Sequence, residues 1–250
     1  MSLIILNLNL ILSHKNLIKE LKMGLYDRAG TYAQEREFMN DTALVNFVKT
    51  TYKFFAASLL FATLGALVGL MNFAAVVEYR WAFFIAEIVA FFGLMFSKGK
   101  PGLNVGLLFV FTTLSGVTLV PLLGFVIARS GLGAIWQALG MSTIIFGLMS
   151  VYALKTKKDL ANMGKMLFIA LIVVVICSIV NIFMGSPMFQ VLIAGACAIL
   201  FSLYVAYDTQ NIVRGLYDSP IDAAVSLYLD FLNIFISILQ LIGLLGNNRD

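Results

Sequence analysis

Three carboxyl side chains lie within long apolar segments of this sequence, where a charge is costly: Glu87, Asp208 and Asp230. Carboxyl groups at membrane depth usually face the interior of a helix bundle and mark an ion or proton pathway. The alternative is that the two aspartates are structural residues whose hydrogen bonds tie helices together. Because the single histidine, His14, lies in the N-terminal segment, a site built on histidine is excluded.

The spacing of Asp208 and Asp230 predicts similar depths on two antiparallel helices. Residues 214–220 separate the helices, with Ser219 suited to the N-cap and Pro220 to the first helical position. Asp208 lies six residues before this segment, and Asp230 lies ten residues after its last residue. At about 1.5 Å per residue, the two depths differ by about one helical turn. The aspartates can therefore meet, but the sequence leaves open whether they face each other.

If Asp208 and Asp230 meet in an apolar interior, they cannot easily both be ionised. Two carboxyl groups in this position share one proton, and the pair changes its charge near physiological pH. Loss of the shared proton introduces repulsion that can open the helix contact or create a cation site. We therefore expect a proton-dependent switch at these two residues.

The composition requires an all-α, polytopic membrane bundle. Apolar residues make up 61% of the chain and charged residues 12%, whereas a soluble domain needs roughly a quarter charged residues. Seven transmembrane helices are expected, and the last must be central because Asp230, Asn233 and Gln240 would not be tolerated facing lipid. The expected spans are 50–72, 81–97, 103–128, 132–153, 165–184, 188–212 and 221–245.

Two regions are expected: an N-terminal extension, residues 1–45, partly disordered and cytoplasmic, and a transmembrane domain, residues 46–250. The apolar run at residues 3–12 is too short to span and lacks the features of a signal peptide. Because Met23 offers a second start, residues 1–22 are interpreted as a disordered or loosely attached extension whose native status is open.

The basic residues orient the chain. An excess of lysine and arginine in alternate loops predicts a cytoplasmic N-terminus, and seven spans then place the C-terminus outside. The loops predicted to be inside hold Lys98, Lys100, Lys155, Lys157, Lys158, Lys165 and Arg214, and those outside hold Arg80, Arg129 and Arg249. Since no basic face with interleaved aromatic residues is present, nucleic-acid binding is not expected.

Lys98 and Glu87 each have two possible interpretations. Lys98 ends the second span near the expected depth of Asp208, so it can pair with an ionised aspartate or act as a snorkelling anchor. Glu87, eleven residues deeper, can line a cavity or hydrogen-bond a neighbouring helix.

Small residues and cysteines are assigned to packing. The pairs Gly65–Gly69 and Gly102–Gly106 are predicted to allow close helix approach. Cys177 and Cys197 lie in apolar runs without metal-site spacing, and they are interpreted as packing residues.

Two C-terminal segments resemble the signatures of the Bax inhibitor-1 family, also called the transmembrane Bax inhibitor motif family. They are SLYVAYDTQNI at 202–212 and SLYLDFLNIFISILQLIG at 226–243. The resemblance extends over about residues 45–245, through AEIVAFFGLMFSKGK at 86–100, FTTLSGVTLVPLL at 111–123 and KKDL at 157–160.

This resemblance implies seven helices with a central last helix, and a pH-sensitive calcium leak controlled by a pair of aspartates. The pair corresponds to Asp208 and Asp230, near which calcium can bind. The family's acidic residue in the second helix corresponds to Glu87, and the basic latch corresponds to Lys98, which is arginine in some members. Some members have a basic residue where this chain has Gln240, and that departure argues against a second ion pair with Glu87.

The expected function is therefore a pH-sensitive calcium leak channel without enzymatic activity or a resident cofactor. The expected location is the bacterial inner membrane, with the lipid bilayer, calcium ions and protons as partners. The alternative is a regulatory protein that modulates a membrane-bound protease or a stress or cell-death pathway without transport. An intramembrane aspartyl protease is disfavoured, because Tyr207-Asp208 fits such enzymes but residues 227–230 lack the required glycines.

Overall fold

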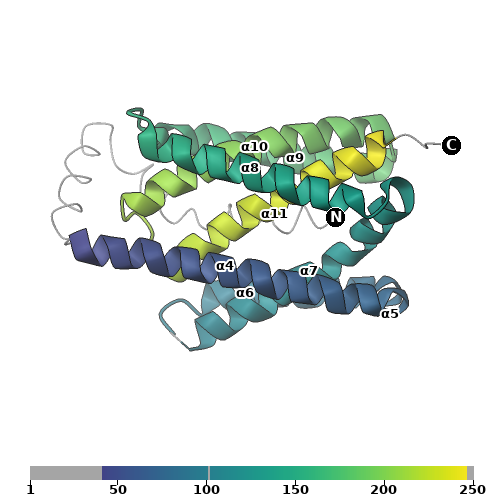
Figure 1. Ribbon diagram of the computed structural model, residues 1–250, viewed down its shortest axis with the longest axis horizontal. Coiled ribbons are helices and arrows are strands. Elements are labelled where there is room, and N and C mark those ends of the chain that lie inside the picture. Colours follow the sequence, from purple (N-terminus) through teal and green to yellow (C-terminus); the bar gives the residue numbers. More distant parts are fainter. Residues whose placement is uncertain (1–40, 101, 247–250) are drawn as a thin grey trace.

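The described part of the chain is built from helices joined by short loops. The computed structural model describes residues 41–100 and 102–246, which contain no β-strand (Figure 1). The elements are α4 (Asp41–Met71), α5 (Phe73–Glu78), α6 (Arg80–Phe96), α7 (Leu103–Ser130), α8 (Gly133–Lys155), the 3-10 helix η1 (Leu160–Met163), α9 (Gly164–Met184), α10 (Pro187–Val213) and α11 (Pro220–Leu245). Of the predicted N-terminal extension, residues 1–45, residues 41–45 belong to α4. Residues 1–40, and with them the question of whether residues 1–22 are native, lie outside the described residues.

Six helical segments of the described chain are long and apolar enough to cross a membrane: α4, α7, α8, η1 with α9, α10 and α11. The protein is therefore an integral, multi-pass membrane protein. The segment predicted as the second of seven spans is α6, which has 17 residues. That length lies at the lower end of the roughly 17–25 residues that cross a hydrocarbon core. The predicted count of seven thus depends on α6.

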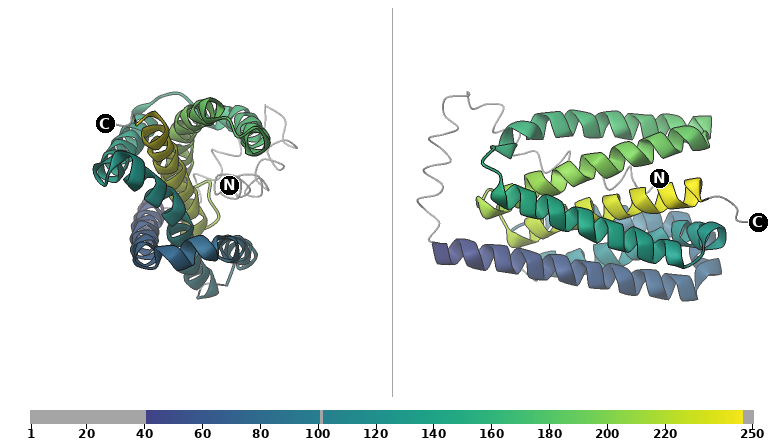
Figure 2. Two further views of the ribbon diagram at one scale, coloured as in Figure 1. Left: turned by 90° about the vertical axis from the view of Figure 1, so that its right-hand side faces the viewer. Right: turned by 45° about the horizontal axis from the view of Figure 1, so that its top comes forward.

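Helix α11 is the most buried of the six candidate spans. In its most apolar stretch 78% of the residues are buried, against 22% in α4 and α8. It contacts α4, α7, α8 and α10, and it lies among them in the end-on view on the left of Figure 2. A spanning helix can carry Asp230 and Asn233 under these conditions because both residues face protein.

Helices α4 and α7 pack backbone against backbone. A Cβ atom added at Gly65 would overlap the carbonyl oxygen of Thr113, and one added at Gly116 would overlap that of Ala62. The close approach predicted for the Gly65–Gly69 face is therefore confirmed. The prediction for Gly102–Gly106 is wrong, since a Cβ at either position would meet no neighbouring atom within 4 Å among the described residues.

The chain reverses between α10 and α11 as the sequence predicts. The Ser219 hydroxyl accepts hydrogen bonds from the backbone N–H groups of Ile221 and Asp222, at 3.1 and 3.2 Å. Pro220 occupies the first turn of α11, and its fixed φ suits that position. The result is an antiparallel pair of contacting helices, seen side by side in green and yellow in Figure 1.

Candidate functional site

The carboxyl groups of Asp208 on α10 and Asp230 on α11 meet inside the bundle. The two side chains lie within hydrogen-bonding reach of each other. Their relative exposures are 2% and 1%. The rotation of the two helices, which the sequence left open, thus brings both aspartates to one contact.

Three of the four oxygens in this pair have no hydrogen-bond partner within the described parts of the chain: Oδ2 of Asp208, and Oδ1 and Oδ2 of Asp230. With both groups ionised, these oxygens would hold buried negative charge without a donor, which is costly. One proton held between the two carboxyl groups supplies a donor and removes one charge. The geometry therefore suits a proton-sharing pair.

Two tyrosines border the pair. Tyr217, in the loop between α10 and α11, hydrogen-bonds through its side chain to Asp208 and Ser226. Burial, followed by the negative charge of Asp208, raises the pKa of Tyr217 well above its usual value, so its hydroxyl remains a donor. Tyr204 lies one turn before Asp208 and interacts electrostatically with both aspartates. Its buried hydroxyl has no hydrogen-bond partner among the residues described.

Lys98 does not form the predicted latch with Asp208. Its Nζ lies 3.1 Å from Oδ2 of Asp222, in the first turn of α11, and its side chain is 48% exposed. Asp222 precedes Asp230 by eight residues on α11, about 12 Å along a helix. The exposed end of α6 therefore reaches the start of α11, and the aspartate pair lies deeper.

Glu87 occupies a separate polar cluster between α6, α7 and α11. It is 1% exposed, and its Oε2 accepts a hydrogen bond of 2.8 Å from Thr118 Oγ1. Tyr228 of α11 interacts with it electrostatically, and the Tyr228 hydroxyl makes a short contact with that of Ser115. Glu87 was predicted either to line a cavity or to hydrogen-bond a neighbouring helix, and the structure contains the hydrogen bond, to Thr118 of α7.

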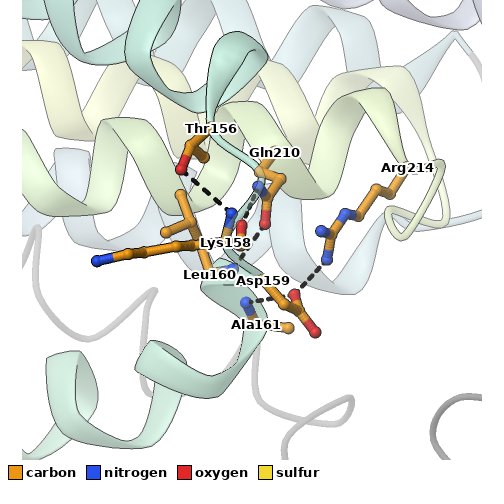
Figure 3. A network of polar contacts seen from close by, with 7 residues as sticks. All are labelled: Thr156, Lys158, Asp159, Leu160, Ala161, Gln210 and Arg214. Atoms are coloured by element: carbon orange, nitrogen blue, oxygen red, sulfur yellow. Dashed lines mark hydrogen bonds and ion pairs between the residues drawn. The ribbon is translucent and has the colours of Figure 1, made fainter.

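A polar clamp holds the loop before α9 against the end of α10 (Figure 3). Gln210 Oε1 accepts a hydrogen bond from the Leu160 N–H at 2.7 Å, and its Nε2 donates to the Lys158 carbonyl at 3.0 Å. Gln210 lies two residues beyond Asp208 on α10. This positioning residue was not predicted from the sequence, although it lies in the 202–212 segment that resembles a family signature.

An ion pair completes the clamp. Arg214 bonds to the carboxylate of Asp159, which also accepts a hydrogen bond of 3.1 Å from the Ala161 N–H and so caps η1. Figure 3 shows Gln210 and Arg214, both from the end of α10, reaching the KKDL segment, residues 157–160. This segment is thereby fixed to the helix that carries Asp208.

These features define a class: a helical, multi-pass membrane protein with a buried pair of carboxyl groups between two contacting helices. The family model described as "Inhibitor of apoptosis-promoting Bax1" matches residues 44–249. The chain belongs to the Bax inhibitor-1 family, which confirms the resemblance drawn from the sequence.

Similar proteins occur in several bacteria. An uncharacterized protein of Helicobacter pylori is 76% identical over 228 residues, covering 90% of this chain and 99% of that protein. An uncharacterized protein of Campylobacter jejuni is 47% identical over 227 residues, covering 88% and 97%. An uncharacterized membrane protein of Vibrio cholerae is 40% identical over 141 residues, covering 56% and 63%.

Proposed function

We propose that this protein is a pH-sensitive calcium leak channel, controlled by the proton that Asp208 and Asp230 share. The observation that carries the proposal is the contact of two buried carboxyl groups, three of whose oxygens have no partner in the described structure. When both groups ionise, two like charges face each other in a medium of low dielectric and repel strongly. That repulsion acts directly on the contact between α10 and α11.

The chemistry of the pair suits the passage of calcium better than its retention. Calcium takes 6–8 oxygen ligands, and tight sites supply several carboxylates. Among residues 41–100 and 102–246, His, Cys, Asp and Glu do not gather in groups of three that could hold a metal. A calcium ion at Asp208 and Asp230 is therefore proposed to be the transported ion.

The proposed topology has seven crossings, with α6 as the second and α11 at the centre. The ion pair of Lys98 with Asp222 supports this, because it puts the end of α6 at the same face as the start of α11. The clamp on Gln210 adds the lysine-rich loop after α8 to that face. An excess of basic loops on one face favours a cytoplasmic N-terminus and an external C-terminus in the bacterial inner membrane.

Calcium flux in proteoliposomes tests the proposal. The purified protein is reconstituted with a calcium-sensitive dye, and flux is measured between about pH 5 and about pH 8, where a shared carboxyl proton is lost. We expect wild-type flux to change with pH, and Asp208→Asn and Asp230→Asn to flatten that profile. Asp218→Asn, the same change at an exposed loop carboxyl, should retain the wild-type profile.

Absence of wild-type flux would contradict the channel, as would wild-type profiles in both Asn variants. Regulation of a membrane-bound protease or a stress pathway without transport would then become the better function.

A further inference from the structure

A line of polar side chains follows α11 along the side that faces α10. Its members recur every three or four residues: Ser226, Asp230, Asn233, Ser237 and Gln240. This spacing keeps them on one face of a helix. The three middle members are buried, whereas the two end members are partly exposed. The line therefore leads from one end of the bundle to the other through its interior.

Helix α10 places a polar or polarizable partner opposite three of these residues. Asp208 meets Asp230, and the thiol of Cys197 meets the hydroxyl of Ser237 through a side-chain hydrogen bond. Nearer the far end, Gln190 Nε2 donates to Gln240 Oε1 at 3.0 Å. We call these eight residues, five on α11 and three on α10, the polar seam.

The middle of the polar seam holds buried oxygens that have no partner within the described chain. Besides the three oxygens of the aspartate pair, Oδ1 of Asn233 lies one turn further along α11, and the Tyr204 hydroxyl, outside the polar seam, borders the pair. Buried polar atoms are normally satisfied by protein or by water. This stretch is therefore suited to take up water or a cation when the helices part.

An uncharged bridge spans the polar seam at the end opposite Tyr217. Asn181 Nδ2 donates to Gln190 Oε1 at 2.8 Å, and Gln190 in turn donates to Gln240. Oδ1 of Asn181 accepts a hydrogen bond of 3.2 Å from the Ser186 N–H at the start of α10. The bridge thus ties α9, α10 and α11 together across the line that leads to the aspartate pair.

We propose that the polar seam is one water-accessible path, and that the bridge Asn181–Gln190–Gln240 is a second gate in series with the aspartate pair. This inference rests on the proposed leak function and assigns a role to residues that the pair alone leaves unexplained. None of the three amide side chains titrates. The aspartate pair then supplies the response to pH, and the amide bridge limits access from the other end at every pH.

Cys197 is a natural reporter for this gate because it lies between the bridge and the aspartate pair. It is 0% exposed, and its thiolate, which forms readily only where water reaches the sulfur, is the nucleophile that attacks a methanethiosulfonate, forming a mixed disulfide and releasing methanesulfinate. In a Cys177→Ser background Cys197 is the only cysteine. The labelling rate with a membrane-impermeant, cationic methanethiosulfonate is followed by mass spectrometry on the full-length protein.

Opening of the bridge should expose the reporter. Gln240→Ala and Gln190→Ala each remove the hydrogen bond between α10 and α11, and we expect labelling of Cys197 to accelerate about tenfold. Gln240→Glu keeps the acceptor for Gln190, so labelling should remain slow. Gln137→Ala on the exposed side of α8 makes the same side-chain change outside the polar seam and should label like the parent.

Equal labelling rates in the parent and both alanine variants would overturn the gate. A rise confined to variants whose thermal unfolding midpoint has collapsed would also count against it. The readout needs no calcium, so the two proposals fail separately. Bridge-dependent labelling without flux in any variant would contradict the calcium leak, and pH-dependent flux with unchanged labelling would contradict the gate.

Discussion

Lys98, in the turn that follows α6, forms an ion pair with Asp222 in the first turn of α11, with 3.1 Å between Nζ and Oδ2. Asp222 also lies where the positive end of the helix dipole favours a carboxylate, next to the N-cap Ser219. This carboxylate therefore has two stabilising contacts at the bundle surface. Lys98 is occupied there and does not hold the buried aspartates.

Replacement of Lys98 by glutamine should have a small effect. The pair is partly exposed and screened by solvent, so we expect its loss to lower the free energy of unfolding by less than about 1 kcal/mol. The pH profile of calcium flux should not change, because Lys98 does not contact Asp208. Thermal unfolding in detergent and proteoliposome flux measure the two effects, with Lys100→Gln as control. A shift of the flux profile as large as that of Asp208→Asn would restore the latch.

The unfolding midpoint should fall as pH rises from about 5 to about 8. An aspartate in the unfolded chain loses its proton near pH 4, whereas the folded pair retains one between its carboxyl groups. The folded state then binds more protons than the unfolded state, so stability decreases with rising pH, by at most about 1.4 kcal/mol per pH unit. The double variant Asp208→Asn/Asp230→Asn should remove most of this slope, because either aspartate alone is still buried, and Asp218→Asn should remove none. An equal dependence of the unfolding midpoint on pH in the wild type, the double variant and Asp218→Asn would show that the pair does not share a proton.

Tyr217→Phe should move the pH response of flux to higher pH. The Tyr217 hydroxyl hydrogen-bonds to Asp208, and a donor stabilises a carboxylate more than a carboxylic acid. Without that donor, ionisation of the pair requires a higher pH, by about one unit or less. Tyr79→Phe, at an exposed tyrosine, is the matched control. A midpoint displaced to lower pH would contradict the assigned hydrogen bond.

Gly116→Ala should destabilise the protein, whereas Gly106→Ala should not, although both glycines lie in α7. A methyl group at Gly116 collides with backbone atoms of α4, while one at Gly106 meets open space. Overpacking of this kind costs about 1–3 kcal/mol, and alanine in a free helical position gains up to about 1 kcal/mol over glycine. Thermal unfolding of the two variants side by side provides the comparison. Equal midpoints would show that α4 and α7 separate easily at this contact.

The sequence predicted those features that depend on local signals. Apolar runs of membrane length placed the helices to within a few residues, except that α4 (Asp41–Met71) includes residues before the predicted start at residue 50. The Ser219–Pro220 pair predicted the reversal between α10 and α11, and counting from that turn put Asp208 and Asp230 at matching depths. Each of these inferences needs only the rise along one helix.

The predictions that were wrong, and the contacts that were not predicted, depend on the direction in which a side chain points around its helix axis. This direction turns by about 100° from one residue to the next. The partner of Lys98 and the open face at Gly102–Gly106 belong to this group, because neither motif specifies which helix lies opposite. Gln210 and Gln190 were also missed. Their hydrogen bonds join residues that are 50 positions apart in the chain. A single polar residue in an apolar segment does not indicate which residue it will bond to.

The glycine contact between α4 and α7 divides the bundle mechanically. Because their backbones touch at Gly65 and Gly116, a sliding movement of these two helices would bring backbone atoms into collision, so we expect them to act as a fixed frame. The α10–α11 hairpin is joined instead by a carboxyl pair and neutral hydrogen bonds, which break and reform singly. Any opening movement should therefore part α10 from α11 while the α4–α7 pair keeps its place.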